Sequence, residues 1–195
     1  MLAKRSLAIE EANMNAYSMP TFETSDPTVR TMLEGPKSHL GFVPNLLLGL
    51  SNSQPTLGAY LDLGKHFAKV GLSAAEMQTV LTVASVENGC GYCVAAHSTF
   101  AAKAKMDPEV LIALRRGAHS RDEKLNALAA FVRSLVRSKG HVAEADFARF
   151  LSAGYTREQS IGVLIGIAMK TIANFGNHLM EMPLDVQFAA QRWDT

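Results

Sequence analysis

The 195-residue chain has only two cysteines, no long apolar run and no block of charge of one sign. Its 19 basic and 18 acidic residues nearly cancel, so nothing in the charge pattern indicates nucleic acid binding. The most apolar segments, near 79–86 and 161–173, fall short of the ~20 apolar residues that span a membrane. The N-terminal stretch also lacks the apolar core of a signal peptide. We therefore expect a cytoplasmic protein that binds neither nucleic acid nor membrane.

Helix signals recur along the chain, and no segment has the alternation bounded by turns that marks a strand. Capping boxes at Ser73, Ser120 and Thr156 predict three helix starts, and Gly35-Pro36 predicts the end of an earlier helix. The sequence predicts an all-α fold, with residues 1–25 as an N-terminal arm and 26–195 as a single helical domain.

Two of these helix starts resemble each other. Gly71-Leu72-Ser73 precedes one helix and Gly154-Tyr155-Thr156 precedes another. This similarity indicates either a degenerate helical duplication or two capped helices that are alike for local reasons.

The two cysteines, Cys90 and Cys93, form one C-x-x-C motif, and His97 follows four residues later. On a helix that begins near Cys90, these three side chains share one face. A dithiol can give up two electrons and become a disulfide, and an imidazole one turn away can accept a thiol proton. The positive end of the helix dipole further favours a thiolate at Cys90. This pattern is typical of thiol-based redox catalysis, which needs no prosthetic group.

Two other interpretations of the motif remain open. The cysteines are inert buried residues, as free cysteines often are. Alternatively, they bind zinc together with His97, although three ligands are one short of a structural zinc site.

The segments Leu72–Glu76 and Asn88–Ser98 resemble the carboxymuconolactone decarboxylase-like family, and within it the alkylhydroperoxidase AhpD-like branch. The resemblance implies an all-helical domain that assembles into trimers or hexamers. It also implies a thiol-dependent peroxidase: Cys93 attacks a hydroperoxide, Cys90 resolves the resulting sulfenic acid, and His97 is the proton relay. The partners are then the hydroperoxide and a dithiol or protein-thiol reductant.

The chain departs from the family pattern at Gln78, where hydroperoxidases of this type carry a glutamate that feeds protons to the histidine. An amide orients a water but accepts no proton. Eleven residues separate Glu76 from Glu87, which brings these two to one helix face, roughly opposite Gln78. This position argues against Glu76. Glu87 can still reach the histidine if the helix ends just before it and the chain turns at Asn88-Gly89, and our hypothesis is that Glu87 supplies the missing carboxylate. Tyr92, between the cysteines, is expected to form a hydrogen bond or to line a substrate pocket with Gln78.

Three functions follow from these residues. The first is a cysteine-based peroxidase or disulfide oxidoreductase. The second is decarboxylation of a cyclic lactone, a lyase activity that makes no use of the cysteines. The third is a thiol sensor or metal-binding module without turnover. The high apolar content predicts a homo-oligomer, with Phe188 and Trp193 docking on a neighbouring copy.

Overall fold

The computed structural model describes residues 17–194, and these residues form helices without a strand. The all-α prediction is confirmed. The helices, in chain order, are α2 (Pro27–Leu40), α3 (Asn45–Leu50), α4 (Gln54–Phe67), α5 (Ala74–Glu87), α6 (Gly91–Lys103), α7 (Pro108–Arg116), α8 (Glu123–Arg137), α9 (Glu144–Ser152), α10 (Arg157–Met180) and the short 3-10 helix η1 (Val186–Gln191). None of them is both long and apolar enough to cross a membrane.

Two of the three predicted capping boxes are present. The Ser73 and Thr156 hydroxyls each accept a hydrogen bond from the backbone N–H three residues on, and Glu76 and Gln159 reach back to the cap. The box predicted at Ser120 is wrong. That helix begins two residues later, because the Asp122 carboxylate accepts from Leu125 N–H while Ser120 bonds to the Asn126 side chain.

The helix end predicted at Gly35-Pro36 is also wrong. α2 continues through Pro36 to Leu40 and ends at Gly41, whose positive φ of 83° closes the last turn. A proline inside a helix removes one backbone hydrogen bond. Val29 and Leu33 are buried on the same helix, and their burial offsets that loss.

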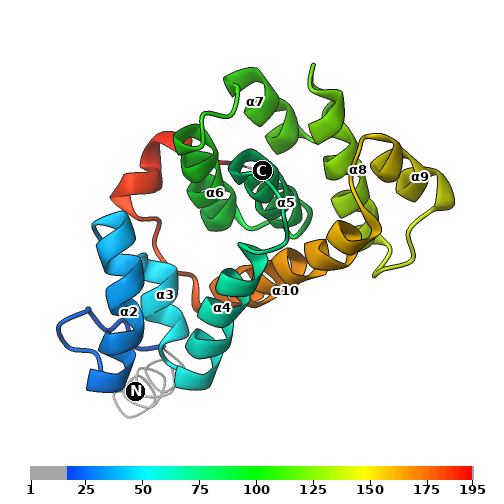
Figure 1. The fold of residues 1–195 in the computed structure, drawn as a ribbon. Coiled ribbons are helices and arrows are strands. Elements are labelled where there is room, and N and C mark those ends of the chain that lie inside the picture. The colour runs from blue at the N-terminus through cyan, green and yellow to red at the C-terminus, as the bar shows by residue number, and fades with distance from the viewer. Residues whose placement is uncertain (1–16, 195) are drawn as a thin grey trace, which may run out of the picture.

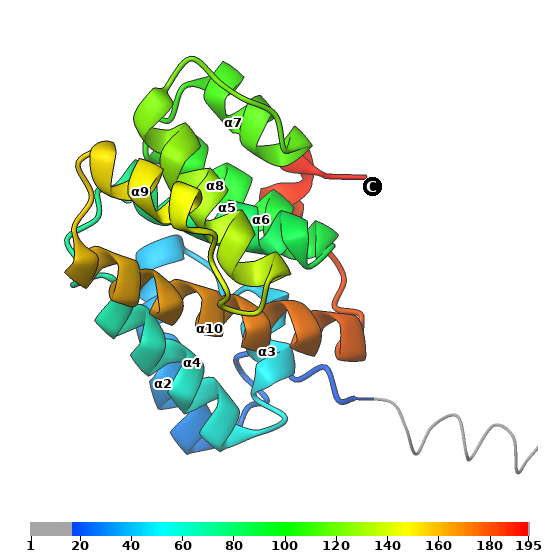
Figure 2. The same ribbon diagram turned by 90° about the vertical axis from the view of Figure 1, so that its right-hand side faces the viewer.

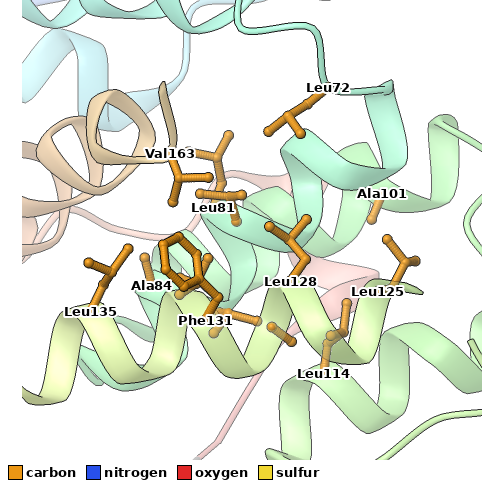
Figure 3. Packing of buried hydrophobic residues seen from close by; sticks show 14 of the residues in the cluster. Leu72, Leu81, Ala84, Ala101, Leu114, Leu125, Leu128, Phe131, Leu135 and Val163 are labelled. Atoms are coloured by element: carbon orange, nitrogen blue, oxygen red, sulfur yellow. The ribbon is translucent and has the colours of Figure 1, made fainter. Parts of the chain in front are cut away.

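α10 runs through the middle of the molecule, with α5 to α9 on one side and α2 to α4 on the other (Figures 1 and 2). It therefore contributes to two apolar cores. The first packs α5, α8, α9 and the N-terminal half of α10 around residues such as Leu81, Leu128, Phe131 and Val163 (Figure 3). The second lies between α2, α3, α6, η1 and the C-terminal half of α10. Both cysteines belong to this second core.

The predicted arm lies mostly outside the described residues. Its described part, from Tyr17 to Ser25, leads into α2, and Ser18 bonds to the Asn52 side chain of the same chain. Whether residues 1–25 cover a neighbouring copy stays a prediction.

The two similar helix starts at Ser73 and Thr156 are alike in structure. Gly71 and Gly154 both have positive φ, and the residues between glycine and cap, Leu72 and Tyr155, are both buried. The similarity stops there, because the chain breaks between α5 and α6 whereas α10 is continuous. His178 on α10 is exposed, unlike the buried His97.

Candidate active site

The break between α5 and α6 sets the positions of the two cysteines. Gly89 has a positive φ of 68°, which favours glycine, and turns the chain after α5. Cys90 is the N-cap residue of α6, and its N–H donates to the Ser85 carbonyl at 3.0 Å. Cys93 lies in the first turn of α6. Both thiols are free and buried, with 0% and 1% of the residue exposed.

The two thiols differ in their electrostatic surroundings. The pKa of Cys93 is lowered by the hydrogen bond from the Cys90 thiol, by the nearby Lys170 ammonium and by the Asn174 side chain. Together these effects outweigh burial, which by itself would raise the pKa. The pKa of Cys90 is raised, because its proton is held by Cys93 and because the thiol is buried. Cys93 is therefore the thiol that ionises more readily, whereas the helix dipole alone had predicted Cys90.

His97 is held between Gln78 and Lys170. Its Nε2 lies 2.7 Å from Lys170 Nζ and its Nδ1 lies 3.0 Å from Gln78 Oε1. An ammonium has no acceptor, so Nε2 accepts from Lys170, and Nδ1 carries the hydrogen that it donates to Gln78. Burial and the adjacent positive charge hold the pKa of His97 well below its usual range. The ring is thus neutral, and both of its nitrogens are occupied by partners other than the thiols.

Lys170 is the residue that sequence reasoning missed. It lies in the middle of α10 and is 1% exposed. Its pKa is raised despite the opposing effect of burial, because Tyr60 and the two cysteines favour the charged form. The signal was in the sequence: Lys170 is the only Asp, Glu, Lys or Arg between Glu158 and Glu181. A charge isolated in an apolar helix points to a buried functional group.

The prediction that Glu87 supplies a carboxylate to His97 needs correction. Glu87 points to α8, where Oε1 lies 3.0 Å from Arg133 Nε and also accepts from Arg137. The helical geometry behind the prediction was right, since Glu76 faces α8 as well, through Lys124. That face lies away from the cysteines, and the end of α5 does not turn Glu87 back toward them. Gln78 is the α5 residue that reaches the histidine.

Tyr92 both forms hydrogen bonds and lines the pocket, the two roles left open for it. Its hydroxyl donates to the Asp185 carboxylate and accepts from Leu46 N–H at 3.2 Å. The carboxylate also accepts from Asn45 N–H. Burial and the nearby carboxylate raise the pKa of Tyr92. Tyr92 therefore ties the segment after α10 to the start of α3.

The segment after α10 covers the site from the same chain. Phe188 is 1% exposed and packs edge-to-face on Phe42, Tyr92 and Phe100. The prediction that Phe188 docks on a neighbouring copy is therefore wrong. η1 packs along α6, and Figure 1 shows it in red beside that helix.

A cavity of about 130 Å³ reaches Cys93 but does not include Cys90. Its polar groups are Cys93, His97, Lys170 and the two tyrosines Tyr60 and Tyr92. The remaining wall is apolar and consists of Leu40, Pro44, Leu46, Leu47, Ala96, Phe100 and Phe188. The cavity thus brings the Cys93 sulfur and the Lys170 ammonium into one small, otherwise largely apolar space.

The residues do not suit the zinc interpretation. Within residues 17–194 no group of three or more His, Cys, Asp or Glu is placed to hold a metal ion. His97 in particular has its Nε2 lone pair directed at Lys170.

Comparison with known proteins agrees with the motif. Residues 55–135, which include both cysteines and His97, match the model of the carboxymuconolactone decarboxylase family. The family resemblance is confirmed. Among proteins of curated function, none matches the chain.

Solved structures share the fold over most of the chain. The AhpD core of a peroxidase-related protein from Ralstonia eutropha is 22% identical with a TM-score of 0.77, over 88% of this chain and 93% of that one. A peroxidase-related protein from a Silicibacter species is 22% identical with a TM-score of 0.75, over 90% and 94%. The debrominase Bmp8 bound to 2,3,4-tribromopyrrole is 21% identical with a TM-score of 0.73, over 85% and 89%. At this identity the similarity establishes the fold.

Proposed function

We propose that the protein is a thiol-dependent peroxidase that reduces organic hydroperoxides with the Cys90–Cys93 pair. The observation that carries this proposal is the asymmetry of the two sulfurs. Cys93 lines the cavity and has a lowered pKa, while Cys90 lies behind it, keeps its proton and is absent from the cavity wall. A peroxidase needs one accessible thiolate and one nearby thiol in reserve.

The reaction follows from that asymmetry. The Cys93 thiolate attacks the terminal oxygen of the hydroperoxide and breaks the O–O bond. This gives a sulfenic acid and an alkoxide, and the alkoxide takes up a proton to become the alcohol. The Cys90 thiol then condenses with the sulfenic acid, forming the disulfide and releasing water. A dithiol reductant restores both thiols through a mixed disulfide. Such cycling suits the reducing cytosol, which is where we expect the protein to work.

Single-turnover chemistry tests this function. Reduced protein mixed with one equivalent of cumene hydroperoxide should lose both thiols and gain a Cys90–Cys93 disulfide, seen by thiol titration and mass spectrometry. Cys90→Ser should still react once and stop at a sulfenic acid that dimedone traps. Cys93→Ser should not react. If both thiols of the wild-type protein survive excess peroxide, the proposal fails.

A second candidate function is reductive dehalogenation. It is favoured by the apolar wall around the Cys93 thiolate and by the fold shared with a debrominase. The thiolate would take the bromine from a bromopyrrole ring carbon, that carbon would gain a proton, and Cys90 would displace bromide to form the disulfide. One bromoarene and two thiols would thus give one arene, one disulfide and hydrogen bromide. Release of bromide from 2,3,4-tribromopyrrole, dependent on Cys93, would identify this activity.

Lactone decarboxylation remains as the alternative that needs no sulfur. It predicts turnover of a carboxymuconolactone that is unaffected when both cysteines are replaced by serine. The peroxidase and dehalogenation reactions both predict complete loss of activity in the same double variant. A single preparation of that variant therefore distinguishes lactone decarboxylation from the two thiol-dependent reactions.

A further inference from the structure

The charged form of the buried Lys170 is favoured by Tyr60 and by the two cysteines. Its Nζ contacts His97 Nε2 at 2.7 Å and lies 5.9 Å from the centre of the Tyr60 ring. Among residues 17–194 no carboxylate forms an ion pair with it. His97 is neutral, and Cys93 is the cysteine whose pKa is lowered, in part by Lys170. The Cys93 thiolate is therefore the negative charge that we assign to the buried ammonium.

That balance is lost at the moment of reaction. When the thiolate attacks a peroxide, the sulfur becomes neutral and the negative charge moves to the leaving oxygen. Lys170 lines the same cavity as Cys93, so the new alkoxide forms beside the ammonium. A buried ammonium without a counter-charge is costly, and an alkoxide is a strong base. Transfer of one proton from nitrogen to oxygen removes both charges at once.

We infer that Lys170 is the general acid that protonates the leaving oxygen, and that His97 positions it. This assignment rests on the proposed peroxidase function. The Cys93 thiolate, the hydroperoxide and the Lys170 ammonium give the sulfenic acid, the alcohol and a neutral lysine amine. Cys90 then forms the disulfide and water forms from the sulfenic hydroxyl and the Cys90 proton. On reduction, the two protons of the dithiol reductant return to Cys90 and Lys170, and the thiolate is restored.

This role accounts for the amide at position 78. A carboxylate at Gln78 would favour a protonated imidazole, and Nε2 would then no longer accept the hydrogen bond from Lys170. The Gln78 oxygen instead accepts from Nδ1–H and leaves the Nε2 lone pair directed at the lysine. His97 thereby orients the ammonium without itself exchanging a proton.

The test compares two oxidants that both carry a phenyl ring but whose leaving groups differ in basicity. Cumene hydroperoxide releases an alkoxide, which needs a proton, while perbenzoic acid releases a carboxylate, which does not. Rates of Cys93 oxidation are measured by stopped flow at a pH where the thiolate absorbance shows Cys93 fully ionised. In Lys170→Met the rate of Cys93 oxidation by cumene hydroperoxide should fall about 100-fold or more, which is the usual contribution of a general acid. The rate with perbenzoic acid should fall only a few-fold. Equal losses with both oxidants would overturn the inference.

Lys170→Arg is the matched control for charge. A guanidinium stabilises the thiolate but does not release its proton near neutral pH. This variant should keep a low Cys93 pKa and perbenzoic acid reactivity, yet lose the cumene hydroperoxide rate. An arginine variant as fast as wild type with both oxidants would overturn the assignment.

The wild-type protein supplies a test that depends on no variant. Its rates with a series of hydroperoxides of increasing leaving-group basicity should change little, because Lys170 neutralises the leaving oxygen. A steep fall along the series would refute the acid role while leaving the peroxidase function in place. Failure of the peroxidase function itself would appear as no Cys93 oxidation by either oxidant.

Discussion

The chemistry of the site depends on which side chain holds a charge and which holds a proton. Cys93 and Lys170 form the charged pair, and Cys90 and His97 are the neutral groups that support it. The Asn174 side chain helps to lower the pKa of Cys93. It also accepts a hydrogen bond at 2.9 Å from Asn88, the C-cap residue of α5, and donates one to Ser85. The buried ammonium therefore contributes to the lowered pKa of Cys93.

The lowered pKa of Cys93 makes the reaction with peroxide depend on pH. The thiolate is the reactive form, so the rate should rise with pH through the pKa of Cys93 and level off above it. That midpoint should fall below the ordinary thiol value of about 8.5. Lys170→Met removes a favourable charge and should move the midpoint upward by about one pH unit or more. Alkylation of Cys93 by iodoacetamide as a function of pH, in Cys90→Ser with and without Lys170→Met, measures both midpoints. The serine hydroxyl can still donate to Cys93, so a Cys90→Ser midpoint above about 8.5 would contradict a lowered pKa at Cys93.

Glu87 should matter for stability and not for catalysis. Its side chain is 7% exposed, and its negative charge balances the positive charge of Arg133. One terminal nitrogen of Arg133 is already buried without a hydrogen-bond partner. Glu87→Gln should therefore lower the free energy of unfolding by about 1–3 kcal/mol and leave the peroxide rate unchanged.

The control for Glu87 is an exposed ion pair. Glu109 has a side chain that is 77% exposed and lies 3.8 Å from Arg121. Glu109→Gln should change the free energy of unfolding by less than about 0.5 kcal/mol. Urea unfolding compares the two variants, and a slowed peroxide reaction in Glu87→Gln would return Glu87 to the active site.

At the level of elements, α10 determines where Lys170 lies. Glycine lets α10 approach its neighbours closely: a Cβ atom added at Gly166 would lie 2.8 Å from Phe67 Cζ and 3.0 Å from Val80 Cγ1. Both neighbours are buried and have little room to move. A change in this packing would shift α10. Lys170 lies on the same helix, one turn after Gly166.

Gly166→Ala should destabilise the protein although alanine favours helix. Overpacking of a core costs about 1–3 kcal/mol, which exceeds the ~1 kcal/mol that helix propensity gains. Gly58→Ala is the matched control, because at that site in α4 the nearest atom to an added Cβ is Met32 Cε at 3.9 Å, so the variant should become more stable by about 0.5–1 kcal/mol. Thermal unfolding measures both, and a stabilised Gly166→Ala would contradict the close packing described here.

At the scale of the whole molecule, α10 also has an apolar outer face. Ile161, Leu164, Phe175 and Leu179 are 68%, 43%, 57% and 66% exposed. Exposed positions 161, 164, 168, 171, 175 and 178 follow the alternating spacing of three and four residues along which two helices pack together. We expect a second copy of the chain to cover this face, consistent with the homo-oligomer that the resemblance implies.

The oligomer prediction is tested by mass in solution. Light scattering should give a mass larger than one 21.1 kDa chain, and Phe175→Lys should reduce it because a charge on this face opposes burial. Val186→Lys changes a residue that is 81% exposed but lies outside α10, and should leave the mass unchanged. A monomeric wild-type protein would contradict the prediction.

Rules that act over a few residues were sufficient for much of this protein. Capping boxes predicted the starts of α5 and α10, and the helix expected to begin near Cys90 is α6, with Cys90 as its N-cap. The same rules failed at Pro36, where burial of Val29 and Leu33 carried the helix through a residue that normally ends one.

The active site required contacts between residues far apart in the chain. Helical spacing placed Cys93 and His97 on one face, because residues three or four apart always share a side. No local pattern indicates that Lys170 reaches His97 across 73 positions, or that Glu87 turns to α8. Those pairings depend on how α10 and α8 pack against α5 and α6, and packing is set by the shape of the assembled cores.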